Sequence, residues 1–178
     1  MEHSVRSATI DDLAGIAAIY DPECLHGLNT LMTEARTRDE WRAWLREHES
    51  ERYPALVVRG DVQRGEPAVL GWASLSKWSE RAGYARTAEN SVYVHHAAQG
   101  RGVGRALMTE LLARARQNDV CLVIARIYDG NASSVAFHAS LGFETIGVMK
   151  RCGEKFGKIV DVRVMGKNLE GTDEPMKR

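Results

Sequence analysis

Residues 91–107 read SVYVHHAAQGRGVGRAL, and this stretch decides the fold. Val92, Tyr93 and Val94 are β-branched or aromatic and predict the end of a strand. A glycine-rich turn follows and leads directly into an amphipathic helix. A strand that delivers a turn to a helix N-terminus leaves backbone N–H groups unpaired, and the helix dipole adds to their attraction for anions. The stretch therefore predicts an anion-binding turn inside an α/β domain.

Two familiar phosphate-binding motifs do not fit this turn. The nucleoside-triphosphate loop needs Lys and then Ser or Thr after its last glycine, whereas Gly104 is followed by Arg-Ala. The dinucleotide fingerprint fails from Gly100 and from Gly102, because no glycine stands at the sixth position. A glycine turn that binds nothing is the alternative, although Gln99 and Arg101 add donors that a plain turn does not need.

Composition limits the class of protein. The 178 residues suit one domain, for which we expect residues 1–170, followed by a polar tail at 171–178. Lys plus Arg and Asp plus Glu both total 24, which argues against nucleic acid or an anionic membrane surface as a partner. No segment predicts a membrane span or a signal peptide. Three separated cysteines lack metal-ligand spacing, so we expect no metal and a cytoplasmic location.

Periodicity and turn residues predict the remaining elements. Capping patterns at Thr9 and Thr37 begin two helices, and Pro22 and Gly27 predict that residues 21–33 are irregular. Further helices are expected at 102–117 and 132–140. The expected strands lie at 4–8, 54–59, 68–76, 87–95, 121–127, 144–150 and 159–168. This order, strand, two helices, three strands, helix, strand, helix, two strands, predicts a mixed α/β sheet.

The spacing Gln99-x-x-Gly102-x-Gly104 matches the Gln/Arg-x-x-Gly-x-Gly/Ala pattern of the GCN5-related N-acetyltransferases (GNAT), and the chain resembles that superfamily. The resemblance implies a mixed central sheet flanked by helices on both faces, with a splayed strand pair that binds acetyl-CoA. The coenzyme-binding residues that it implies are Val92, Tyr93, Val94, Gln99, Gly100, Arg101, Gly102, Val103, Gly104, Arg105, Asn131 and Ser134.

A narrower resemblance covers most of the chain, from about Val5 to Leu169. The run from Glu89 to Val94 is similar to the Glu-x-Ser/Thr-Val-Tyr-Val strand of the phosphinothricin and methionine sulfoximine N-acetyltransferases. It implies transfer of acetyl from acetyl-CoA to the α-amine of a small amino-acid analogue, by direct attack in a ternary complex and in a homodimer. The alternatives are another amine (a peptide N-terminus, a lysine or another small amine) and a non-catalytic coenzyme A-binding module.

The same resemblance assigns catalytic roles, each beside a structural alternative. Glu89 is the implied general base, because an apolar cleft makes a carboxylate a better proton acceptor near neutral pH; it could instead only pair with an arginine. His138 stands where many relatives carry a tyrosine that protonates the departing thiolate, but it could simply pack beside Phe137 and Phe143. Asn131 and Ser134 could bind the pantetheine arm or cap their helix.

Substrate-binding positions follow from the loop that resembles the family's aromatic-and-arginine segment. Arg81 is expected to bind the substrate's carboxylate, because a guanidinium recognises that group bidentately, or else to be a solvated arginine paired with Glu80. Trp78 and Tyr84 would supply the walls. Leu31 replaces an aromatic residue of the family, so the pocket is expected to be reshaped.

Overall fold

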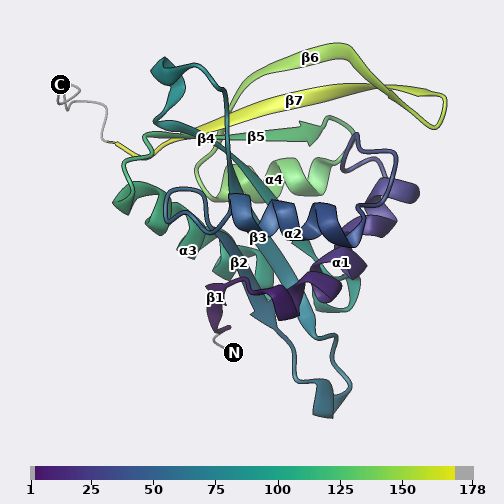
Figure 1. Cartoon of the computed structure of the whole chain (residues 1–178). Coiled ribbons are helices and arrows are strands. Elements are labelled where there is room, and N and C mark those ends of the chain that lie inside the picture. Colours follow the sequence, from purple (N-terminus) through teal and green to yellow (C-terminus); the bar gives the residue numbers. More distant parts are fainter. Residues whose placement is uncertain (1–2, 171–178) are drawn as a thin grey trace.

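A seven-stranded sheet organises the computed structural model, in which residues 3–170 are described (Figure 1). Its strand order is β1-β2-β3-β4-β5-β7-β6, and all neighbours are antiparallel except β4 and β5. The strands are β1 (Val5–Ser7), β2 (Ala55–Arg59), β3 (Val69–Lys77), β4 (Thr87–Val94), β5 (Leu122–Tyr128), β6 (Glu144–Lys155) and β7 (Lys158–Asn168). The predicted order of elements is confirmed. The expected polar tail, 171–178, lies outside the described residues.

Within the described residues, four α-helices connect these strands: α1 (Leu13–Leu25), α2 (Arg38–Glu47), α3 (Val103–Gln117) and α4 (Ala132–Ser140). The capping box that begins α2 forms as predicted, since Thr37 N–H donates to Glu40 Oε2 at 2.7 Å and Glu40 N–H donates to Thr37 Oγ1 at 3.3 Å. The irregular segment predicted from residue 21 was wrong at its start, because α1 continues through Pro22. Packing of that last turn prevails over the proline, and Cys24 is fully buried there.

Helices cover both faces of the sheet, each over its own core (Figure 1). On one face α3 packs its apolar side on β2, β3 and β4, with Leu107, Met108 and Leu111 fully buried. On the other face α1 and α2 enclose an aromatic core that includes Tyr20 and Trp72. Side chains along β4 alternate between these faces, as a strand requires.

The long β6–β7 hairpin reaches back to the segment after α1. Lys155, at the end of β6, is buried at 1% exposure and donates to the carbonyl oxygens of Glu23 and Thr30, both at 2.8 Å. The structure ends β6 at residue 155 rather than at the predicted 150. The hairpin therefore fixes the loop that precedes α2. Between residues 3 and 170, no helix is long and apolar enough to cross a membrane.

Candidate functional site

The predicted anion-binding turn lies between β4 and α3. Gly100 has φ +74° and Gly102, the residue before the helix, has φ +84°. A Cβ built on either glycine would meet no atom within 4 Å. These glycines are therefore needed for their left-handed backbone rather than for close packing. The open space above them is available to a ligand.

Backbone donors converge in this turn. Five backbone N–H groups of this turn have no hydrogen-bond acceptor in the part of the chain that the structure describes. They belong to Gly100, Gly102, Val103, Gly104 and Arg105. The last three begin α3, where the helix dipole adds a partial positive charge. The Gln99 side chain folds back to the Val94 carbonyl oxygen at 3.4 Å, and Arg105 donates to Ser140 Oγ at 2.9 Å. The turn thus has the donor set that a diphosphate requires.

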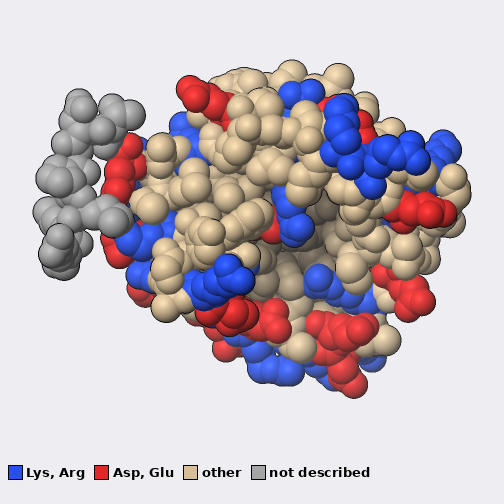
Figure 2. Space-filling model, turned by 90° about the horizontal axis from the view of Figure 1, so that it is seen from above, with Lys and Arg blue, Asp and Glu red and all other residues tan. Residues whose placement is uncertain are grey.

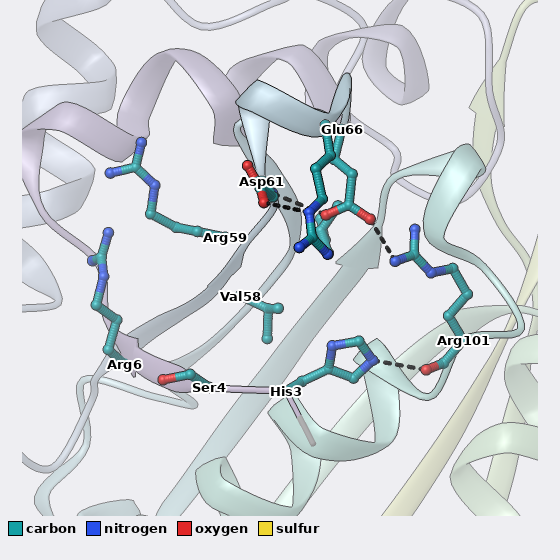
Figure 3. Close-up of a pocket in the computed structure, with 10 residues that line it drawn as sticks. His3, Ser4, Arg6, Val58, Arg59, Asp61, Glu66 and Arg101 are labelled. Atoms are coloured by element: carbon teal, nitrogen blue, oxygen red, sulfur yellow. Dashed lines mark hydrogen bonds and ion pairs between the residues drawn. The ribbon is translucent and has the colours of Figure 1, made fainter. Parts of the chain in front are cut away.

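Arg101 is directed away from this set. Its guanidinium pairs with Glu66 at 2.6 Å, and its carbonyl oxygen accepts from His3 at 2.7 Å (Figure 3). Both contacts border a cavity of about 370 Å³ between the turn and the β1–β2 edge. The other arginines of this cavity also have carboxylate partners: Arg6 and Arg59 with Asp12, and Arg64 with Asp61. The Arg101 side chain, which was expected to bind the coenzyme, is therefore paired with a carboxylate and directed away from the turn.

The strand pair splays as the resemblance implied. β4 and β5 are paired only at Thr87–Leu122, Ala88–Val123 and Glu89–Ile124, and they separate beyond that point. His95 N–H donates to Leu70 O at 2.9 Å, in register with the β3–β4 ladder. Because amide directions alternate along a strand, the N–H groups of Val92 and Val94 face the gap. The gap therefore contains two backbone donors.

Tyr93 differs from this expectation. The same alternation turns its amide into the β3–β4 ladder, so its backbone is not a free donor. Its ring stacks on Trp72 at 5.0 Å, and its hydroxyl donates to the Asn29 carbonyl oxygen at 3.1 Å. Burial raises the pKa of the Tyr93 phenol, which keeps it a neutral donor. Tyr93 therefore ties the loop after α1 to β4.

Glu89 lies where the strands begin to separate, and it has a partner. Arg126 of β5 donates from Nε to Oε1 at 2.6 Å and from Nη2 to Oε2 at 2.8 Å. Glu89 is 20% exposed and Arg126 is 51% exposed, so the pair is open to solvent on one side. The hydrogen bonds that Arg126 donates to Glu89 raise the pKa of Arg126 above its ordinary value. The structure thus contains the arginine pairing that was the alternative to a base.

His138 is buried in the core on the α3–α4 side. Its Nδ1 lies 2.9 Å from the Ser134 carbonyl oxygen and therefore carries the proton, and its Nε2 accepts from Asn90 Nδ2 at 3.2 Å. Burial lowers the pKa of the imidazole. The ring also packs edge-on against Phe137 and Phe143. The geometry favours the packing alternative, since neither nitrogen has a proton free to donate to a thiolate.

The sequence did not single out Arg126, the partner of Glu89, and it did not single out Asn90. Asn90 is 7% exposed, and its Oδ1 is a buried acceptor without a partner in the described part of the chain. Its position inside the Glu89–Val94 run was the available signal. Nothing in the spacing pointed to its hydrogen bond with His138, which lies 48 residues further along the chain.

Asn131 and Ser134 occupy the N-terminus of α4. Asn131 Oδ1 accepts from the Ser134 amide at 2.9 Å, which is a helix cap. Asn131 Nδ2 also donates to Asn29 Oδ1 at 2.6 Å. The structure shows the capping alternative for this pair, and it joins the cap to the loop after α1.

The expected substrate-binding residues lie on two loops, of which the β3–β4 loop reaches the Glu89–Arg126 pair through Trp78. Trp78 has the Arg126 guanidinium 5.8 Å from its ring centre. Arg81 and Tyr84 are exposed, and the Arg81 guanidinium has no partner within residues 3–170, so the alternative pairing with Glu80 is absent and Glu80 pairs with Lys77 instead. Leu31 is 43% exposed and lies against Gly153 of β6. Viewed from above, the surface has a hollow with side chains of both charges at its rim (Figure 2).

Among the residues described, no group of three or more His, Cys, Asp or Glu side chains is placed to bind a metal ion. The site therefore consists of backbone donors, one carboxylate and one guanidinium.

Comparison with known proteins gives consistent results. Residues 14–143 match the family model described as the acetyltransferase (GNAT) family. The chain is 37% identical over 174 residues to an L-methionine sulfoximine/L-methionine sulfone acetyltransferase of Pseudomonas aeruginosa, covering 97% of this chain and 98% of the relative. It is 34% identical over 172 residues to the L-amino acid N-acyltransferase MnaT of Escherichia coli, covering 97% of each.

Among solved structures, a phosphinothricin acetyltransferase from Sinorhizobium meliloti in complex with acetyl-CoA superposes with a TM-score of 0.90. The two chains are 32% identical, and the match covers 99% of this chain and 94% of the other.

Proposed function

The chain belongs to the acetyltransferase (GNAT) family, and from that premise we propose that it acetylates the α-amine of a small amino-acid analogue. Methionine sulfone, methionine sulfoximine and phosphinothricin are the compounds that represent this class. The observation that carries the proposal is the opening between β4 and β5. It has free backbone donors along it and the Glu89–Arg126 ion pair at its start. Acetyl-CoA is the co-substrate, and it supplies the thioester.

The residues present fit coenzyme A. The free amides from Gly100 to Arg105 would hold its diphosphate, and the amides of Val92 and Val94 would donate to the acyl carbonyl. Donors fixed by a β-strand need no reorganisation as negative charge develops on that oxygen, which makes them effective electrostatic catalysts.

Glu89 is the proposed general base. It would accept the proton of the substrate's ammonium group, so that the neutral amine can attack the thioester carbon directly. Because Arg126 holds both carboxylate oxygens in the free enzyme, Glu89 must first be released. In this proposal His138 takes part in no proton transfer. Its hydrogen bond with Asn90 positions that side chain at the start of the opening.

An assay of thiol release from acetyl-CoA over a panel of amines tests the proposal. Turnover with methionine sulfone, methionine sulfoximine or phosphinothricin supports it. Turnover only with peptides, lysine or other small amines would replace the substrate class and keep the reaction. Coenzyme A binding without thiol release from any amine would instead indicate a non-catalytic binding module.

The remaining proposals concern organisation. We propose one domain over residues 1–170, a cytoplasmic location that suits three free cysteines, and a homodimer. Four large apolar side chains of the β6–β7 hairpin are 40–62% exposed, which supports a second copy of the chain as their partner. They are Ile146, Met149, Phe156 and Ile159. Sedimentation equilibrium tests the dimer, and a monomer at micromolar concentration would refute it.

A further inference from the structure

The Glu89–Arg126 ion pair bridges the first residues of the opening between β4 and β5. Glu89 is the last β4 residue paired with β5, where it lies opposite Ile124. Arg126 is two residues further along β5, where the strands have already separated. The pair therefore closes the point at which a substrate amine must meet the thioester.

Arg126 has the surroundings of a ligand-binding arginine. Its guanidinium is half exposed, and within residues 3–170 it has no carboxylate partner other than Glu89. The indole of Trp78 lies on one side of it, at 5.8 Å. A guanidinium that donates through Nε and one Nη can make the same two-point contact with any other carboxylate.

A zwitterion fits both halves of this pair. An α-amino acid carries an ammonium and a carboxylate on one carbon, so it offers a cation to Glu89 and an anion to Arg126 at the same time. Exchange of one internal ion pair for two intermolecular ones leaves neither side chain with an unpaired charge. An amine that lacks the carboxylate would separate Glu89 from Arg126 and leave the positive charge of Arg126 without a partner.

We propose that Arg126 binds the substrate's α-carboxylate, and that this exchange releases Glu89 to receive the ammonium group. The inference rests on the proposed function and adds the residue that selects free amino acids over other amines. Once Arg126 binds the substrate carboxylate, both carboxylate oxygens of Glu89 are free to accept hydrogen bonds from the ammonium group. Recognition of the carboxylate and activation of the base are then one event.

Arg81 is the natural comparison, because the sequence resemblance gave it this role. It lies in the loop between β3 and β4 and is exposed, and its guanidinium has no hydrogen-bond or ion-pair partner among residues 3–170, although its backbone N–H donates to Ser79 Oγ. It makes no contact with Glu89 among the described hydrogen bonds and ion pairs, whereas Arg126 makes two. Substitution of each arginine by methionine therefore separates the two assignments.

The experiment compares two substrates that differ only in the carboxylate: methionine sulfone and its carboxamide. For Arg126→Met we expect kcat/KM to fall about 10- to 100-fold on methionine sulfone, the range for a lost charged hydrogen-bonded pair. On the carboxamide we expect less than a threefold change. Arg126→Lys should restore part of the loss on methionine sulfone, and Arg81→Met should affect both substrates alike. Coenzyme A affinity and thermal melting verify that each variant is folded.

Two results would overturn the inference. An equal fall on both substrates would mean that Arg126 only positions Glu89, and an unchanged kcat/KM on methionine sulfone would remove it from the site. Failure of the proposed function is a separate result, since the unaltered protein would then show no turnover of methionine sulfone at all.

Discussion

Gly102→Ala isolates the contribution of the turn before α3. Gly102 has φ +84° and ψ 0°, and an added Cβ would meet nothing within 4 Å. The substitution therefore adds backbone strain and no clash. Alanine in a left-handed conformation destabilises the folded state by about 1–2 kcal/mol. It also reduces the conformational entropy of the unfolded chain, which offsets about 0.4–1 kcal/mol of that loss. The expected net loss of stability is about 1 kcal/mol, a fall in Tm of about 2–4 °C for a domain of this size.

Gly65→Ala is the matched control. Gly65 has φ 76° and ψ 14° in the turn before β3, and its Cβ would also meet nothing within 4 Å. Both variants should therefore lose the same stability. Only Gly102→Ala should weaken coenzyme A binding, because strain relief at Gly102 moves amides that would contact the diphosphate. Loss of one charged hydrogen bond corresponds to about 1.5–3 kcal/mol, or roughly 10- to 150-fold in Kd.

Calorimetric titration of coenzyme A and thermal melting measure the two effects separately. If Gly102→Ala lowers Tm as much as Gly65→Ala does and leaves the coenzyme Kd unchanged, the turn is not the diphosphate site. The enzymatic assignment of the opening would then lose its main support.

Three other substitutions or conditions test the proposed chemistry. Glu89→Gln should lower kcat about 10²- to 10⁴-fold, the range for a general base, while the Kd for acetyl-CoA stays within threefold in titrations; equal rates would exclude Glu89 from the mechanism. Cys152→Ser should keep full activity under direct attack, although this exposed thiol is close enough to contribute to the raised pKa of Arg126; an inactive variant with normal Tm would indicate an acyl-cysteine. Burial lowers the pKa values of His48 and His138, so the unfolded chain takes up their protons first as the pH falls. The free energy of unfolding, measured in urea, should therefore have its full value above about pH 6.5. Below that pH it should decrease by at most about 1.4 kcal/mol per pH unit for each histidine. A free energy of unfolding that stays constant from pH 7.5 to 5.5 would contradict this.

Local chemistry explains why much of the fold was predictable from the sequence. The capping box of Thr37 and Glu40 involves residues three apart, and the structure shows both of its hydrogen bonds. The glycine turn is likewise a local matter, because a left-handed backbone selects glycine at Gly100 and Gly102 whatever surrounds them. Pro22 shows the limit of such rules, since the burial of Cys24 and its neighbours extends α1 beyond the proline.

Pairings between distant residues could not be read from the chain. Glu89 and Arg126 are 37 residues apart, and Arg101 and Glu66 are 35 apart. Each charged side chain had several possible partners, and the sheet register chooses among them only after the chain has folded. The motif therefore predicted the turn between β4 and α3, while the sequence left open whether Glu89 is free and where Arg101 points.

The spacing inside β4 shows how one strand could supply both of the proposed kinds of catalytic group. Glu89 is three residues from Val92 and five from Val94, and both separations are odd. In a strand, odd separations reverse both the side-chain face and the amide direction. Glu89 thus presents its side chain on the face opposite to Asn90, while the amides of Val92 and Val94 point sideways into the opening. A shift of the β3–β4 register by one residue would exchange these directions and remove base and backbone donors together. The function therefore depends on the register of β4 as strictly as on the identity of its residues.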